Sequence, residues 1–90
     1  MLSIWKYGIP FQDNPIIEMP SRAQVLCVQS QNSIPNIWAL VDPSMPLVSH
    51  KFRVAGTGHD IAETDARAYV GTFQVGDGAL VFHVFDCGEV

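Results

Sequence analysis

The chain has 90 residues, of which 48% are hydrophobic and 16% charged, and it carries a formal net charge of −4. Five Lys and Arg against nine Asp and Glu argue against a protein that coats nucleic acid, because such proteins bind through clustered basic side chains. No run approaches the ~20 apolar residues that span a bilayer, and the N-terminus lacks the basic and apolar regions of a signal peptide. We therefore expect a cytoplasmic protein with no nucleic-acid partner and no membrane partner.

The apolar content is high for one small domain that covers residues 1–90. At this length folding hides only about 60% of the surface of the unfolded chain, so the core is thin. Strands buried on both faces would account for the surplus of apolar side chains, and so would a subunit interface. We expect a homo-oligomer, with a dimer as the favoured state, joined by β-edge or sheet-face contacts.

Apolar and β-branched runs predict four strands in the first half of the chain: Leu2–Tyr7, Ile16–Met19, Ala23–Gln31 and Ile37–Val41. The second of these is short and ends at Pro20, which is typical of an edge strand. The third and fourth form a hairpin whose loop is residues 32–36, where Asn and Pro favour turning. Residues 42–47 contain two prolines and are predicted to carry the chain from one sheet to another.

The second half predicts a strand over Ser49–Ala55 and a hairpin within Ala68–Asp86. The Ser49–Ala55 strand alternates, with Lys51 and Arg53 on a basic, solvent-facing side. The hairpin turns at Gly76-Asp77-Gly78, because glycine and aspartate tolerate the positive φ of tight turns.

The second arm of that hairpin, Ala79–Phe85, is apolar on both faces apart from His83, which predicts a central strand. Residues 62–68 have the only helical character, and they are too few for more than a turn or two. About seven short strands then indicate an all-β fold, a small antiparallel β-sandwich or barrel. Four apolar side chains are expected to be largely buried: Trp38, Phe52, Val81 and Phe85.

Metal and redox sites are not expected. The three histidines and two cysteines lack the close spacing of zinc ligands. These residues are His50, His59, His83, Cys27 and Cys87. In a reducing compartment we expect both cysteines to be free thiols. We expect no metal and no cofactor.

Catalytic residues are not expected either. Cys87, His83 and Asp86 are close in sequence, but on a strand His83 and Asp86 point to opposite faces. A lone histidine on an apolar strand face is more often a packed, hydrogen-bonded residue than a catalyst. We therefore predict a protein that is not an enzyme.

The segment Gly56-Thr57-Gly58-His59 is the most motif-like loop of the chain. Its glycines would let an anionic group approach backbone N–H groups, with contacts from Thr57 and His59 and a positive charge from Arg53 or Arg67. These six residues (Arg53, Gly56, Thr57, Gly58, His59 and Arg67) form the candidate ligand site. The alternative is a corner between a strand and a loop, in which the N–H groups are satisfied internally.

An ordered set of motifs resembles a family of small proteins of unknown function encoded by tailed bacteriophages and prophages. The motifs are Trp5-Lys6-Tyr7, Ile17-Glu18-Met19-Pro20, Trp38-Ala39-Leu40-Val41-Asp42, Gly56-Thr57-Gly58-His59, Gly71-Thr72-Phe73 and Val81-Phe82-His83-Val84-Phe85. The resemblance spans nearly the whole chain. It implies a phage-derived protein that works in the host bacterial cytoplasm.

These observations favour a non-enzymatic phage accessory protein that binds a host protein or a host defence component. A first alternative is a sponge that binds a signalling nucleotide, a small anionic ligand, through Gly56–His59. A small hydrolase that uses His59 or His83 and a minor virion component are further alternatives.

Overall fold

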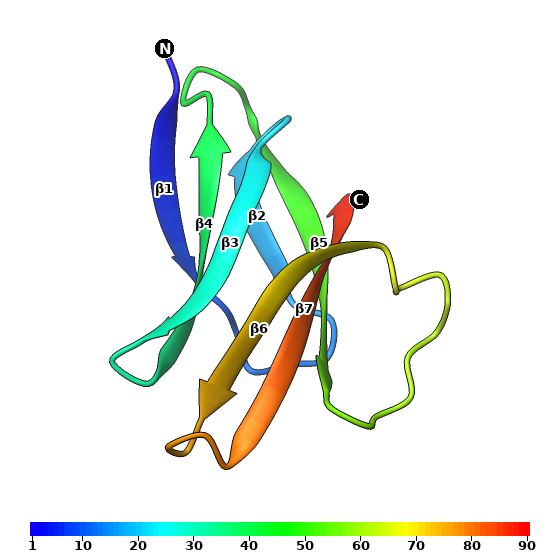
Figure 1. Ribbon diagram of the computed structural model, residues 1–90. Helices are drawn as coiled ribbons and strands as arrows, with labels where there is room; N and C mark the ends of the chain where they lie inside the picture. The colour runs from blue at the N-terminus through cyan, green and yellow to red at the C-terminus, as the bar shows by residue number, and fades with distance from the viewer.

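A computed structural model describes all residues, 1–90, and its regular elements are all β-strands. They form two antiparallel sheets packed as a small β-sandwich (Figure 1), which confirms the all-β prediction. The seven strands are β1 (Ser3–Gly8), β2 (Ile16–Pro20), β3 (Gln24–Gln31), β4 (Ile34–Val41), β5 (Leu47–Gly56), β6 (Ala68–Val75) and β7 (Leu80–Glu89). The structure contains no helix that is both long enough and apolar enough to span a membrane.

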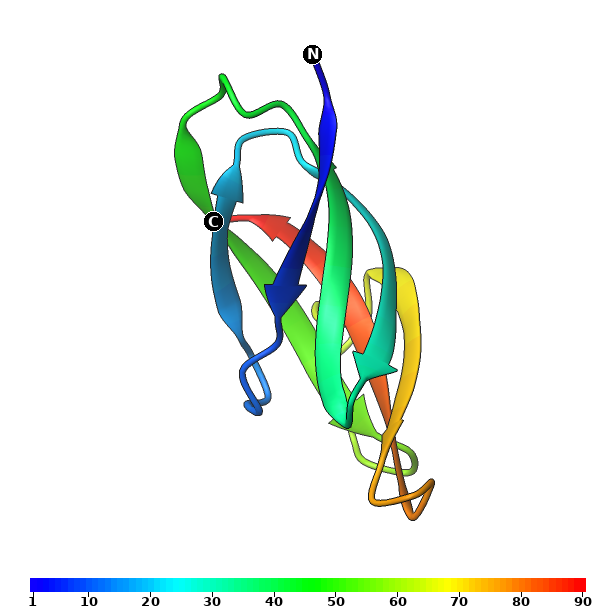
Figure 2. The ribbon, with the colours of Figure 1, turned by 90° about the vertical axis from the view of Figure 1, so that its left-hand side faces the viewer.

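The three-stranded sheet has the order β1-β4-β3, and the four-stranded sheet has the order β2-β5-β7-β6. Seen from the side (Figure 2), the three-stranded sheet lies in front of β5 and β7. The predicted connection over residues 42–47 does carry the chain from one sheet to the other, between β4 and β5. β7 lies between β5 and β6, so the central-strand prediction is confirmed.

The core lies between the sheets. Phe52 of β5, Ile37 of β4 and Val84 of β7 are completely buried, and each such side chain stabilises the fold by roughly 1.5–3 kcal/mol. Tyr7 of β1 packs against this core. Its hydroxyl is buried without a hydrogen-bond partner, and burial raises the pKa of Tyr7 above 10.0.

The sheets approach each other closely along β3 and β6. The hydroxyl of Ser30 on β3 donates a hydrogen bond to the carbonyl of Gln74 on β6 over 2.7 Å. A Cβ at Gly71 would lie 3.0 Å from Cγ1 of Val28, so the absence of a side chain at Gly71 permits this approach. We call this contact the β3–β6 seam.

The two hairpins turn at residues with positive φ. The predicted turn at Gly76-Asp77-Gly78 is confirmed, with φ values of 62°, 54° and 87°. The loop predicted over residues 32–36 is too long, because the chain already turns at Asn32 and Ser33, whose φ values are 53° and 66°. Residues 34–36 belong to β4 and pair with β3.

Three burial predictions are wrong, since Trp38, Val81 and Phe85 are only half-buried, whereas Phe52 is buried as expected. Phe85 lies on the outer face of the four-stranded sheet, where its ring meets the edge of Tyr69 at a centroid distance of 5.2 Å. In a sandwich only one face of each sheet contacts the core, so a strand that is apolar on both faces leaves one of them exposed.

The segment predicted to have helical character forms only a short turn over residues 63–65. The N–H of Ala66 donates to the carbonyl of Ala62 over 3.2 Å, and no further turn follows. This turn belongs to the long β5–β6 connection, residues 57–67, which lies beside the four-stranded sheet at the right of Figure 1.

Candidate functional site

The predicted loop Gly56-Thr57-Gly58-His59 is a tight turn at the end of β5. The N–H of His59 donates to the carbonyl of Gly56 over 3.0 Å, and Gly58 has a φ of 87° at the position where such a turn requires a positive value. The N–H of Thr57 donates to the carbonyl of Val81 on β7 over 3.2 Å. The backbone donors of Thr57 and His59 are thus satisfied within the chain and do not face a ligand.

This turn borders a surface pocket of about 300 Å³. The pocket forms because Gly56 pairs with Phe82 in the sheet, which places the start of β7 beside the turn. Apolar side chains provide most of its wall, and its lining residues are Gly56, Thr57, His59, Ala79, Leu80, Val81 and Phe82. We call it the β5–β7 pocket.

Aromatic packing fixes the Phe82 wall of the β5–β7 pocket. The Phe82 ring stacks on buried Phe73 at a centroid distance of 5.4 Å, and Phe11 meets it edge-on at 5.1 Å. Leu80 at the rim is 54% exposed. The pocket therefore combines a rigid aromatic wall with a free aliphatic side chain.

His59 lies directly on Gly56. A Cβ at Gly56 would be only 2.9 Å from Cε1 of the His59 ring, so any side chain at this position displaces the imidazole. The glycine is needed here for the close approach of His59, whereas Gly58 is needed for its positive φ.

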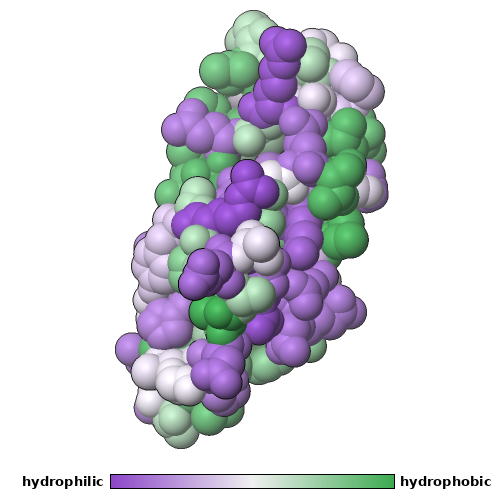
Figure 3. All heavy atoms as spheres, turned by 90° about the vertical axis from the view of Figure 1, so that its right-hand side faces the viewer, coloured by the Kyte–Doolittle hydropathy of each residue, from purple (hydrophilic) through white to green (hydrophobic).

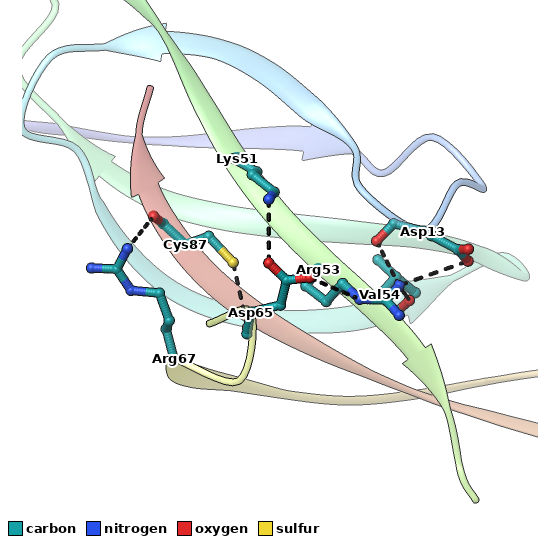
Figure 4. Close-up of polar contacts among 7 residues, drawn as sticks. All are labelled: Asp13, Lys51, Arg53, Val54, Asp65, Arg67 and Cys87. Atoms are coloured by element: carbon teal, nitrogen blue, oxygen red, sulfur yellow. Dashed lines mark hydrogen bonds and ion pairs between the residues drawn. The ribbon is translucent and has the colours of Figure 1, made fainter. Parts of the chain in front are cut away.

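The two arginines of the predicted ligand site are not among the residues that line the pocket, and Figure 4 shows the contacts that they make instead. Arg53 donates to the carbonyls of Asp13 and Val54 over 3.1 and 2.9 Å, and its Nε lies 3.7 Å from Oδ2 of Asp65. Arg67 donates to the carbonyl of Cys87 over 3.3 Å. Of the six predicted residues, the structure brings Gly56, Thr57 and His59 together around the pocket and leaves Arg53, Gly58 and Arg67 outside its lining.

Asp65 holds the β5–β6 connection against the sheet. Its carboxylate lies 3.3 Å from Nζ of Lys51, besides its contact with Arg53, and its carbonyl accepts the thiol of Cys87 over 3.5 Å. Asp65 therefore covers the basic side of β5, whereas the sequence predicted that this side of the strand faces solvent. From the side of this connection (Figure 3), hydrophilic residues dominate the surface, with separate hydrophobic areas between them.

The cysteines lie in different sheets, Cys27 on β3 and Cys87 on β7, and both are free thiols as predicted. Cys87 is buried beneath the Asp65 turn, and burial raises the pKa of its thiol. No three His, Cys, Asp or Glu side chains gather in an arrangement that would hold a metal ion.

His83 is the centre of a hydroxyl network that the sequence did not predict. Its Nε2 lies 2.7 Å from the hydroxyl of Thr57, and its Nδ1 lies 2.7 Å from the hydroxyl of Tyr69, which also contacts Thr72. The β6–β7 register places Thr72 opposite His83, and that register cannot be read from the sequence. The network orients Thr57 at the edge of the pocket.

A second histidine, His50, is buried inside the sandwich. Its Nε2–H donates to Oδ1 of Asp86 over 2.5 Å, its ring stacks on Phe52, and its Nδ1 is buried without a partner. Burial alone would raise the pKa of Asp86, but the hydrogen bonds from His50 and from the N–H of Gly88 outweigh it and lower this pKa below 3.8. Asp86 faces His50 inside the sandwich while His83 contacts hydroxyls of β6, so the two do not form a catalytic pair.

Comparison with known families matches residues 1–89 to a family described as a domain of unknown function (DUF7352). The chain belongs to this family. No curated protein and no solved structure matches it. The DUF7352 family carries no assigned activity, so the function is inferred from the site geometry of this chain.

Proposed function

We propose that this DUF7352 protein is a non-enzymatic accessory protein of a phage or prophage, and that it binds a host protein through the β5–β7 pocket. The pocket would receive an apolar side chain of the partner. The observation that carries this proposal is the lining of the pocket, which is mostly apolar and contains no Lys or Arg.

Charge favours a protein partner over a nucleotide. Arg53 is bound to Asp13 and Asp65, so its charge is already neutralised. Asp60 follows the turn after β5 and Asp77 lies in the turn before β7, so both are near pocket residues in sequence, and the protein is acidic overall. A phosphate group near these carboxylates would be repelled, whereas an apolar side chain would not.

The polar groups of the pocket suit a peptide. Thr57 and His59 can exchange hydrogen bonds with the backbone of a bound segment, while Leu80 and Phe82 contact its side chain. A volume of about 300 Å³ is at the lower limit of small-molecule sites and fits one large side chain. Single buried anchors of this kind carry much of the affinity in protein–protein interfaces.

The resemblance to phage-encoded proteins supports the choice of partner. Small accessory proteins in that setting act on host machinery, and the host cytoplasm is the compartment in which such a partner would be met. The unassigned function of the DUF7352 family is compatible with a binding role.

Photo-crosslinking in the bacterial host tests the proposal. A benzophenone amino acid at position 80, at the rim of the pocket, should crosslink one specific host protein. The matched control is position 47, because Leu47 is 63% exposed and lies at the opposite end of β5 from Gly56. A crosslinked partner that appears equally at both positions, or only at position 47, would contradict the proposal.

A thermal-shift experiment separates this proposal from the nucleotide sponge. Cyclic nucleotides and ADP-ribose compounds should leave the melting temperature unchanged, because no basic side chain lines the pocket. If one of these compounds stabilises the wild type but not His59→Ala, the host-protein proposal is wrong and the protein is a nucleotide sponge. Release of a chemically altered ligand would indicate an enzyme instead.

A further inference from the structure

The sandwich has four sheet edges, and three of them are protected. β3 and β6 face each other along the β3–β6 seam, and each carries an irregularity in its pairing. β2 has only five residues, follows Pro15 and ends at Pro20. Short strands, bulges and prolines are the usual means by which proteins prevent edge-to-edge pairing.

β1 carries neither a bulge nor a proline, and it is one residue longer than β2. It pairs with β4 in continuous register along Ser3–Gly8 and lies at the margin of the molecule in Figure 1. No backbone hydrogen bond outside that pairing reaches Ser3–Gly8. Every second N–H and C=O of β1 therefore faces outward without a partner.

The one charged side chain of β1 is turned away from the free edge. Lys6 donates from Nζ to Oε1 of Gln31 over 2.8 Å, and Gln31 lies on β3, on the far side of β4. A lysine that projected beyond the edge would oppose pairing with a second strand. Lys6 instead leaves the edge open.

Two apolar side chains of β1, Ile4 and Trp5, are poorly covered by the chain itself. Trp5 lies opposite completely buried Ala39 and so shares the inner face of the sheet, yet it is 38% exposed. Ile4 lies opposite Leu40 on the outer face and is 59% exposed. Tryptophan at a sheet margin is typical of an interface.

We propose that two copies of the chain pair antiparallel through β1, so that two three-stranded sheets become one six-stranded sheet. In an antiparallel pair, residues opposite each other share a face of the sheet. The two-fold axis must therefore pass midway between one residue and the same residue of the second copy. An axis at Trp5 pairs it with Trp5 of the second copy and places Ile4 opposite Lys6. An axis at Lys6 would oppose two like charges, which disfavours that register.

Light scattering at micromolar concentration tests the pairing. The wild-type protein should have twice the 9.9 kDa mass of one chain, and Trp5→Asp should reduce it to 9.9 kDa with an unchanged far-UV circular dichroism spectrum. The matched control is Ile16→Asp on edge strand β2, where Ile16 is 53% exposed, and this variant should stay dimeric. A monomeric wild type, or dissociation by Ile16→Asp, would overturn the proposal.

Cysteine crosslinking tests the register and does not depend on whether Trp5→Asp folds. In a Cys27→Ser background, Trp5→Cys should form a disulfide-linked dimer on oxidation, because opposite Cα atoms in antiparallel strands lie about 4.5–5.5 Å apart. Ile4→Cys should not crosslink, because Ile4 of the second copy is displaced by two residues in this pairing, and the two Cα atoms then lie about 7–8 Å apart, which is too far for an unstrained disulfide. Crosslinking by Ile4→Cys alone would contradict an axis at Trp5. The β5–β7 pocket lies elsewhere in the molecule, so the proposed function does not depend on this result.

Discussion

The contact between His50 and Asp86 joins β5 to β7 inside the sandwich and makes stability depend on pH. The pKa of Asp86 is lowered in the folded protein, so its contribution to stability is complete above the ordinary value of 3.8 and is lost as pH falls below it. Nδ1 of buried His50 already lacks a hydrogen-bond partner. Removing the carboxylate of Asp86 would also take the charged acceptor from Nε2–H.

Asp86→Asn should therefore be less stable than wild type at pH 7, and the two should converge in acid. The measurement is the free energy of unfolding by urea between neutral pH and pH values below the ordinary carboxyl range. Asp60→Asn is the control, because Asp60 is exposed and makes no ion pair. A constant difference between Asp86→Asn and wild type at all pH values would show that Asp86 acts through packing and not through its charge.

At the scale of the elements, the contacts of one acidic side chain, Asp65, hold the β5–β6 connection to the sheet. Asp65 meets Lys51 and Arg53, whose Nε is buried without a hydrogen bond. Asp65→Asn should cost about 1–2 kcal/mol of stability, between the values for exposed and buried ion pairs. It should also increase hydrogen exchange in residues 57–67 more than elsewhere. Glu63→Gln in the same turn is the control, and equal exchange in both variants would exclude this role for Asp65.

The sequence predicted the elements better than it predicted their contacts. Alternation located the strands and the Gly76-Asp77-Gly78 turn, because those signals are local. The short turn at Asn32 and Ser33 was missed, since Pro35 and the asparagines suggested a longer loop. The Asp65 contacts were missed because they join residues 12–14 positions apart across an irregular connection that no periodicity describes.

At the scale of the whole molecule, the candidate site was predicted in part. Gly56, Thr57 and His59 were identified by their local composition, and they do line the pocket. Its other wall, from Leu80 to Phe82, depends on the register between β5 and β7, which pairs Gly56 with Phe82. Arg53 was expected at the site because it is near in sequence, but strand alternation places it with Asp65 instead.

The central claim is that the β5–β7 pocket binds a partner on which the biological effect depends. The most direct measurement is the effect of Leu80→Asp on phage infection or host growth, with the melting temperature of each variant measured in parallel. Leu80 is 54% exposed, so the charge should leave folding intact but abolish the effect, while Leu47→Asp, at a position 63% exposed, should retain it. Full activity of a folded Leu80→Asp variant would contradict the claim.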